Sequence, residues 1–264
     1  MTDIVFPFGN EMPPKVKLQL TTLLNRDEFK VLRRPFWFPV TQKGESAPTG
    51  SQYGGLPWLR ENESSPLCGV CERPMHFFLQ LNMQELPAEV KGKYGSGLIQ
   101  FFYCKRDDCP VENKIPPDRV SLVRLVDITS TGRRAVQREG SYDPFPARRV
   151  TQWEKRIDYV PHLEELNSLG IELTDEEHDL LADWGLIEGG DKLTGWPCWM
   201  QSAEHIYCKR CRREMQFVFQ FDPDINLNYR FGQEFFDRPV DVGCAWLFQC
   251  DEHKEEMAFI WQCL

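Results

Sequence analysis

Cysteine and histidine residues at two places in the chain have the spacing of metal ligands. At the later place a C-x2-C pair is followed by a hydrophobic run and then by a C-x2-H pair. At the earlier place a C-x2-C pair is followed by a C-x4-C pair. The candidate ligands are Cys68, Cys71, Cys104 and Cys109 in the first site, and Cys208, Cys211, Cys250 and His253 in the second. Thiolates and imidazole suit tetrahedral zinc, so the sequence predicts two zinc ions, each held at a short turn known as a zinc knuckle.

Both predicted zinc sites are complete. Four protein ligands leave no open position for water, which predicts structural ions and not hydrolytic ones. The looser C-x4-C spacing makes Cys109 the weakest of the ligands. Two alternatives stay open. The residues could be ordinary buried free cysteines, or both C-x2-C pairs could hold a single metal ion, which leaves Cys104 and Cys250 unexplained.

Predicted strands position each ligand pair. In the first half, apolar runs at 75–81 and 97–103 are expected to be strands, the first following a C-x2-C pair and the second ending at Cys104. If the two strands are antiparallel neighbours, the pairs meet at one end of them. Basic residues beside these turns would offset the negative charge of the thiolates. They are Lys105, Arg106, Lys209, Arg210, Arg212 and Arg213.

The second half of the chain repeats the first. At one constant offset and without a gap, Gly50, Gly55, Pro57, Cys68, Cys71, Met75, Phe77 and Gln80 correspond to Gly190, Gly195, Pro197, Cys208, Cys211, Met215, Phe217 and Gln220. Residues 97–104 recur as 243–250 at a slightly larger offset, which a longer loop within 222–240 explains. A repeat this regular indicates duplication. The predicted fold class is α+β, mainly β: a duplicated, pseudo-twofold β-rich body with two zinc knuckles and a few peripheral helices.

The remaining segments complete the predicted organisation. Residues 1–149 are expected to hold the first repeat with an N-terminal helix and a connector, and residues 150–264 the second repeat preceded by a helical insert, together as one globular unit. Further predicted elements are a helix over 15–24, strands over 36–40 and 120–126, a strand near 150–153 within a connector over 128–160, and helices within 158–187. Thr174 and Glu177 have the spacing of a helix capping box.

The bulk composition indicates a soluble, cytoplasmic protein. The 264 residues carry a net charge of -9 and are 41% hydrophobic. The sequence has no apolar run long enough to cross a bilayer, and its start lacks a basic region followed by a long apolar one, so no membrane association is expected. The negative charge disfavours a nucleic-acid surface, which needs clustered positive charge, and it suits a basic protein partner.

Glycine–proline turns and aromatic strands in both halves resemble those of a known family. The motifs are GGLPW at 54–58, FFLQLN at 77–82, GDKLTGWP at 190–197, MQFVFQFD at 215–222 and FIWQC at 259–263. From about residue 30 onward the chain resembles the YwqG-like bacterial proteins, a domain family of unknown function. The resemblance implies a duplicated β-rich body and suggests a role as an immunity protein beside a bacterial toxin.

The first half also resembles a second family. Residues 54–109 share the GG-P-W turn, the C-x2-C pair, the P-x-F-x-LQ strand and the terminal cysteine pair with the amino-terminal part of programmed cell death protein 2. Relatives of that protein escort a ribosomal protein, so the resemblance implies a client-escort role by analogy. The second half of the chain departs from that pattern, which puts the escort role in doubt.

The sequence favours a protein-binding module that recognises and masks one partner, either a toxin or a basic client. Trp58, Trp196 and Trp199 are candidate anchors for the partner, unless they belong to the core. No catalytic residues are expected, because the sequence contains no P-loop, dinucleotide fingerprint, G-x-S-x-G or H-E-x-x-H motif. The alternatives are an enzyme with an unrecognised active site and, third, a nucleic-acid-binding zinc protein. Three cysteines outside the zinc sites are expected to act as small hydrophobic residues: Cys198, Cys244 and Cys263.

Overall fold

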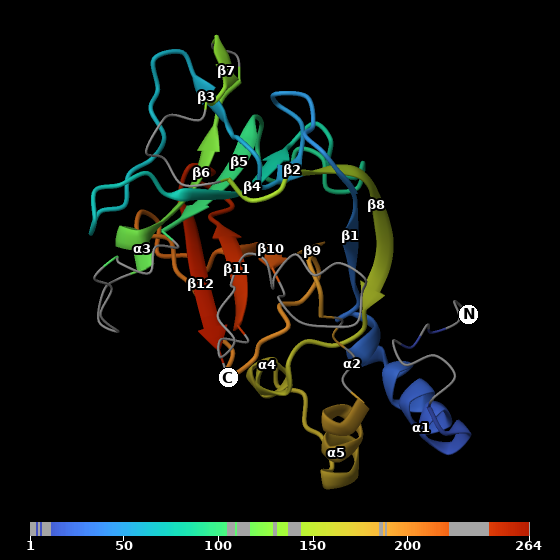
Figure 1. Cartoon of the computed structure of the whole chain (residues 1–264). Coiled ribbons are helices and arrows are strands. Elements are labelled where there is room, and N and C mark those ends of the chain that lie inside the picture. Colours follow the sequence, from blue (N-terminus) through green and yellow to red (C-terminus); the bar gives the residue numbers. More distant parts are fainter. Residues whose placement is uncertain are drawn as a thin grey trace.

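One ten-stranded antiparallel sheet forms the body of the protein (Figure 1). The computed structural model describes residues 4, 6, 12–104, 109, 117–128, 131–136, 144–184, 187, 189–221 and 243–263. Its strands are β1 Arg34–Lys43, β2 Gln52–Tyr53, β3 Trp58–Arg60, β4 His76–Asn82, β5 Leu98–Tyr103, β6 Ser121–Val126, β7 Gly132–Arg134, β8 Arg148–Asp158, β9 Lys192–Thr194, β10 Gln216–Phe221, β11 Gly243–Gln249 and β12 Met257–Cys263. Its helices are α1 Pro14–Leu24, α2 Asp27–Lys30, α3 Pro117–Val120, α4 Leu163–Ser168 and α5 Asp175–Trp184. The prediction of a mainly β fold with few helices is confirmed.

The order of the strands places the two halves of the chain on opposite sides of a central pair. The order is β12-β11-β10-β9-β1-β8-β2-β4-β5-β6, while β3 and β7 form a separate two-stranded sheet. The long strands β1 and β8 pair along their whole length. The end strands β6 and β12 then approach each other, so the sheet is nearly closed on itself (Figure 1).

Aromatic side chains from both halves fill the inside of the curled sheet. Phe101 of β5 stacks on Phe259 of β12 with 4.8 Å between ring centroids, and it lies 5.4 Å from Phe221 of β10. All seven residues of β4 are buried, because its two faces are both covered. A strand covered on both faces shows a continuous apolar run rather than an alternating pattern. This is why the run at 75–81 predicts a strand correctly.

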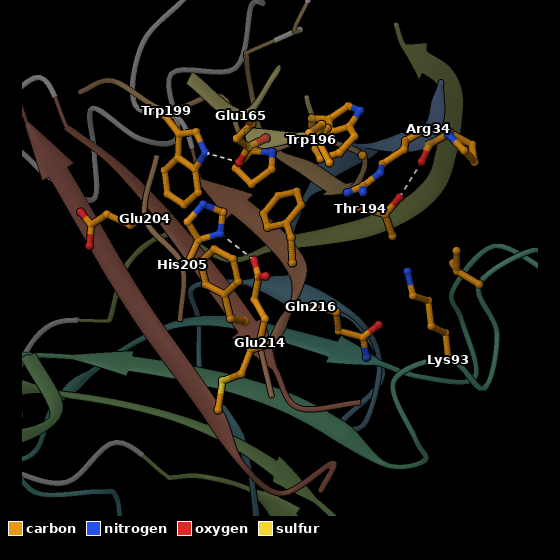
Figure 2. Close-up of a pocket in the computed structure, with 18 of the residues that line it drawn as sticks. Arg34, Lys93, Glu165, Thr194, Trp196, Trp199, Glu204, His205, Glu214 and Gln216 are labelled. Carbon is orange, nitrogen blue, oxygen red and sulfur yellow. Dashed lines mark hydrogen bonds and ion pairs between the residues drawn. The ribbon is translucent and has the colours of Figure 1, made fainter. Parts of the chain in front are cut away.

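The helices α1, α2, α4 and α5 gather at one side of the sheet around a second apolar cluster (Figure 1). Helix α1 begins with a proline at its first turn and buries Leu20, Leu23 and Leu24. The predicted capping box at the start of α5 is confirmed, since Thr174 N donates to Glu177 Oε2 and Glu177 N donates to Thr174 Oγ1. Between α4 and the sheet lies a cavity (Figure 2).

The strands predicted at 97–103 and 120–126 are present, but the prediction for 128–160 is wrong in one respect. Instead of a connector with a short strand near 150–153, this region contains the eleven-residue strand β8 at the centre of the sheet. Most β8 residues are polar and partly exposed, so the sequence shows no alternation of apolar residues that would predict a long strand. The suggested division between residues 149 and 150 falls inside β8. Lys105, Arg106, the loop at 222–240 and the side chain of Cys263 lie outside the described residues.

A buried ion pair joins the second half to the central strands. The ammonium of Lys192 in β9 lies 2.9 Å from Asp158 Oδ2 in β8, and neither side chain is exposed. The same oxygen accepts a hydrogen bond from Trp196 N at 2.8 Å, and the ammonium lies 4.9 Å from the ring centroid of Phe36 in β1. The pair therefore spans three neighbouring strands. No spacing in the sequence links Lys192 to Asp158, so the pair could not be predicted from the sequence.

Candidate metal centres and an adjoining cavity

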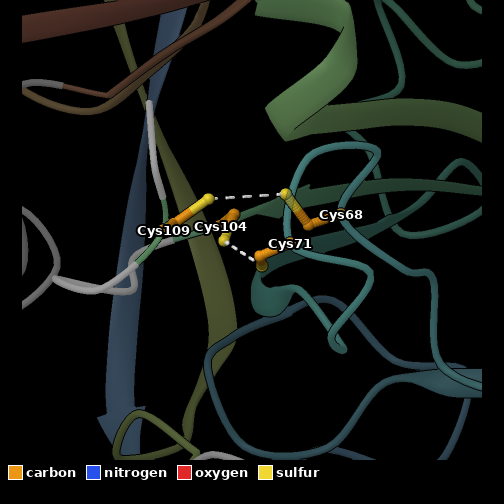
Figure 3. A group of neighbouring side chains, drawn as sticks. All are labelled: Cys68, Cys71, Cys104 and Cys109. Atoms are coloured by element: carbon orange, nitrogen blue, oxygen red, sulfur yellow. Dashed lines mark hydrogen bonds between the residues drawn. The ribbon is translucent and has the colours of Figure 1, made fainter. Parts of the chain in front are cut away.

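The four cysteines predicted as the first zinc site lie together. Cys68 and Cys71 are in the turn before β4, and Cys104 follows β5. Cys68 Sγ lies 3.9 Å from Cys109 Sγ, and Cys71 Sγ lies 3.7 Å from Cys104 Sγ (Figure 3). We call this group the first cluster. It includes Cys109, the ligand with the weakest sequence support.

The second predicted set also comes together. Cys211 Sγ lies 3.6 Å from Cys250 Sγ, while His253 Nδ1 lies 3.8 Å from Cys208 Sγ and 3.7 Å from Cys250 Sγ. We call this group the second cluster. In each cluster the ligand atoms lie within 4.8 Å of one another, so each could hold a metal ion. The two C-x2-C pairs are in different clusters, which excludes the single-metal arrangement in this structure.

The spacing of the ligand atoms fits a tetrahedral metal ion. Metal–sulfur bonds of 2.3 Å at tetrahedral angles place two sulfurs about 3.8 Å apart. The measured sulfur–sulfur distances of 3.6 to 3.9 Å agree with this value. A disulfide would need about 2.05 Å, so the clusters are not disulfide-bonded pairs. The donor set, its number and its geometry therefore all fit a metal ion.

The same backbone turn builds both clusters. In the first, Val70 N points at Cys68 Sγ at 3.4 Å, and Glu72 has a φ of 56°. In the second, Arg210 N points at Cys208 Sγ at 3.4 Å, and Arg212 has a φ of 61°. A positive φ turns the chain back toward the strand that follows. The backbone amides directed at Cys68 and Cys208 offer the hydrogen bonds that a metal-bound sulfur accepts.

Ionisation differs among the thiols of each cluster. A backbone hydrogen bond from Arg213 is the main cause that lowers the pKa of Cys211 to about 6. Burial opposes ionisation of Cys71, yet hydrogen bonds from Arg73 and from neighbouring thiols outweigh it and lower its pKa to about 6. Burial raises the pKa of Cys109 to about 11. In each cluster the second cysteine of the C-x2-C turn thus ionises readily.

Basic residues surround the second cluster as predicted, but two of them are paired with acids. Arg210 pairs with Glu255, and Arg213 pairs with Glu252. The neighbouring Cys211 and Glu252 raise the pKa of Arg213, which keeps this cation charged beside the second cluster.

A cavity of about 620 Å³ adjoins the second cluster. Its walls come from β1, α4, the segment 194–199, the hairpin that carries the second cluster, and the strands β10 and β11. Charged side chains line it at both ends (Figure 2). They are Arg34, Lys93, Glu165, Glu204, His205 and Glu214.

Two acid-containing contacts shape one end of this cavity. Trp199 Nε1 donates to Glu165 Oε1 at 2.9 Å, and His205 Nδ1 lies 2.7 Å from Glu214 Oε1 (Figure 2). Burial is the main cause that raises the pKa of Glu165. The hydrogen bond with Glu214 is the main cause that raises the pKa of His205.

The tryptophans predicted as partner anchors are buried. Their exposed fractions are 3% for Trp58 and 6% for both Trp196 and Trp199. Trp58 packs with Leu98 and Val126. Trp196 and Trp199 line the cavity, so a partner would meet them there and not on an open surface.

Sequence reasoning missed the other functional candidates of the cavity. Arg34, Lys93 and Glu165 come from segments far apart in the chain, and no motif or spacing links them. They meet only because the fold places β1, α4 and the loop between β4 and β5 around one cavity. Within the described residues, no helix has the length and apolar character needed to span a membrane.

A family model described as "Domain of unknown function (DUF1963)" matches residues 51–263, a range that contains both clusters. No curated protein matches the chain. These findings name neither the YwqG-like proteins nor programmed cell death protein 2, so both resemblances stay predictions.

Proposed function

Because the chain belongs to the DUF1963 family, whose description assigns no function, we propose one from its geometry: a zinc-stabilised module that binds and masks a protein partner. The observation that carries this proposal is the complete ligand set of both clusters. A tetrahedral ion held by four protein ligands has no open position for water or substrate. The metals then serve stability, which leaves the surface and the cavity for recognition.

We infer that the two metals are zinc. One ligand set is four cysteines and the other is three cysteines and a histidine, both of which are common structural zinc sites. Soft thiolates also disfavour magnesium and calcium, which prefer oxygen ligands. The sulfur–sulfur distances agree with zinc–sulfur bonds of about 2.3 Å.

We further infer that the body arose by duplication, which the hydrogen bonds of two glutamines support. In the first half Gln80 Nε2 donates to Gly50 O at 2.9 Å, and its Oε1 accepts from Trp58 N at 3.1 Å. The corresponding bonds in the second half join Gln220 to Gly190 at 3.0 Å and to Cys198 at 2.8 Å. The β4–β5 and β10–β11 pairs also share a register shift at matching positions. Two independent folds would not be expected to reproduce these details.

The charge of the chain indicates the kind of partner. A net charge of -9 favours association with a basic protein, such as a toxin or an escorted client. The test is affinity capture of the tagged chain from its own cells, followed by reconstitution with the purified partner. We expect one stoichiometric basic protein whose affinity falls as salt rises. A reconstituted complex that does not form at low salt would refute the proposal.

An enzyme is the second candidate, and the cavity is the observation that favours it. Perturbed acids and histidines in a cavity are typical of active sites, and the pKa values of Glu165 and His205 are both raised. The test is incubation of the protein with a metabolite extract of its cells, followed by mass spectrometry. An enzyme would deplete a metabolite, and Glu165→Gln would abolish the depletion. A binding protein would leave every metabolite chemically unchanged.

A further inference from the structure

We propose that the cavity beside the second cluster binds an amphipathic carboxylate: a molecule with a carboxylate at one end, an aromatic body, and a hydrogen-bond donor at the other end. This inference rests on the proposed binding function, because it names the chemical group that the module would recognise. The group could belong to a free small acid or to the carboxyl terminus of a partner protein. Three features of the cavity carry the inference.

The first feature is a cationic end. Arg34 and Lys93 lie on the same side of the cavity, with Gln216 beside them (Figure 2). Neither cation forms an ion pair with an acid of the described residues; Arg34 lies 3.1 Å from the ring centroid of Trp196, and Lys93 lies 5.3 Å from that of Tyr94. Among the described side chains, Gln216 Nε2 is buried without a hydrogen-bond partner. Two cations and an unused donor form a site for a carboxylate, and a guanidinium can bind it with two hydrogen bonds.

The second feature is an unsatisfied acceptor at the other end. Glu165 is only 8% exposed, and its Oε1 accepts a hydrogen bond from Trp199. Its Oε2 is buried and has no partner among the described residues. A buried acceptor without a donor is unfavourable, so a ligand hydroxyl or amine would be stabilised there. The other acids are engaged, Glu204 by Gln262 and Glu214 by His205.

The third feature is the apolar wall between the two ends. Trp199 is stacked on Phe248 with 6.0 Å between ring centroids, and Trp196, Met215 and Phe217 complete the wall. A cavity of about 620 Å³ is in the size range of small-molecule sites. Aromatic walls with a few polar groups at defined places are characteristic of such sites. An aromatic body therefore fits between the cationic end and Glu165.

The first half of the chain has an aromatic side chain at the place that corresponds to Arg34. In the pairing of β2 with β8, Tyr53 lies opposite Arg148, so Arg148 takes the place that Trp37 has in the pairing of β1 with β9. Phe145 comes as many residues before Arg148 as Arg34 comes before Trp37, so Phe145 corresponds to Arg34. The ring of Phe145 packs on His76 at 5.5 Å, the residue that corresponds to Gln216. The first half thus covers this position with its own aromatic ring, whereas the second half presents a cation and a free amide to the cavity.

The experiment uses the full-length, zinc-loaded protein and probes that carry all three groups. The probes are 4-hydroxyphenylacetate and the peptide Gly-Gly-Tyr with a free carboxyl terminus. The matched probes are 4-hydroxyphenylacetamide and the amidated peptide, which lack the carboxylate, and 4-methoxyphenylacetate, which lacks the donor. Binding is measured by the fluorescence of the cavity tryptophans and checked by calorimetry. We expect saturable binding of the complete probes, with about tenfold or greater weakening in the matched probes.

Variants assign the binding to this cavity. Arg34→Met and Lys93→Met are each expected to weaken binding of the carboxylate probes about tenfold. Lys91→Met is the matched control, because Lys91 is exposed on the same loop and does not line the cavity. It should leave the affinity unchanged. Melting curves of all three variants establish that they are folded. If Arg34→Met is unstable, Lys93→Met alone tests whether the cationic end binds the carboxylate.

The outcomes separate this inference from the proposed function. Stronger binding of the peptide identifies a partner's carboxyl terminus as the source of the carboxylate, and binding of the small acid alone identifies a free metabolite. Absence of binding by both complete probes up to about 10 mM, or equal affinity for acid and amide, overturns the inference. If a captured basic partner binds Arg34→Met as tightly as the unchanged protein, the proposed masking function stands and the carboxylate site is not part of it. If the probes bind but no protein partner does, the module is a small-molecule receptor and the masking function fails.

Discussion

At the scale of single residues, each C-x2-C turn joins a buried cysteine, at which a backbone amide is directed, to a partly exposed one. The amide contact at 3.4 Å occurs at the first cysteine of each C-x2-C turn, and the pKa of the second cysteine is lowered to about 6 in both. Each turn therefore offers a thiolate near neutral pH. A metal ion can then displace the protons of the remaining thiols when it binds.

Replacement of one ligand should unfold one half of the protein. In Cys250→Ser we expect the loss of one metal ion per chain and the collapse of the second half, because structural zinc binding contributes about 10–16 kcal/mol, comparable to the entire stability of about 5–15 kcal/mol. Metal analysis and circular dichroism measure both effects. Cys198→Ser is the control, since Cys198 belongs to neither cluster. An unchanged metal content and melting temperature in Cys250→Ser would refute the second site.

The His205–Glu214 contact predicts a titration. The pKa of His205 is raised above 6.5, chiefly by the hydrogen bond with Glu214. A raised folded-state pKa stabilises the protein below pH 6.5, and this contribution is lost as the pH rises through the folded value. The effect on stability should be small, because the His205 side chain is 41% exposed. The titration of the His205 imidazole can be followed by NMR. Glu214→Gln should lower the pKa of His205, whereas Glu204→Gln should leave that pKa unchanged.

At the scale of elements, each cluster closes one end of a strand pair. The C-x2-C turns precede β4 and β10, and Cys104 and Cys250 follow β5 and β11. A bound metal ion would therefore fix the register of both pairs at the end where a register shift already occurs. The hairpin of the second cluster also forms one wall of the cavity, so the candidate metal site adjoins the proposed binding site.

The buried pair between β9 and β8 predicts a large loss of stability. Lys192→Met would leave Asp158 charged and buried without its cation, at a cost of about 3–5 kcal/mol. We expect the melting temperature to fall by roughly 10 °C. Lys155→Met is the matched control in β8: its ion pair with Glu89 is about half exposed, at 48% and 52%, so its loss should cost about 0–1 kcal/mol. Equal melting temperatures of the two variants would show that the buried pair is not stabilising.

At the scale of the whole molecule, both candidate metal sites belong to one nearly closed sheet. Because β6 and β12 approach each other and Phe101 stacks on Phe259, the two halves share one core. Damage to either half should therefore affect the packing of the other. The net charge of -9 makes copies of the protein repel one another.

Removal of both metals should have a larger effect than removal of one. A strong thiol-competing chelator is expected to release two zinc ions per chain and to abolish the cooperative melting transition. Added zinc should restore it, whereas magnesium should not, because magnesium prefers oxygen ligands. Mass spectrometry of the native protein gives the metal count. Full retention of the melting transition in the metal-free protein would show that the ions are not structural.

The sequence alone determined the two clusters and the strands that carry them. Cys68 and Cys71 are close in the chain, and so are Cys250 and His253, so their spacing already restricts the distance between ligand atoms. Apolar runs then predicted the strands that bring the pairs together, and all eight candidate ligands lie in the two clusters. The spacing of residues along the chain limits the distance between their side chains in any fold, so it can be used before the fold is known.

The tertiary structure decided the rest. The central position of β8 depends on its pairing with β1, which its own polar residues do not reveal. The cavity depends on Arg34, Lys93 and Glu165, whose distances are set by sheet order and by the position of α4. Likewise Trp196 and Trp199 proved to be buried, because exposure is a property of packing and not of residue type. Contacts between distant segments are fixed only when the whole chain folds.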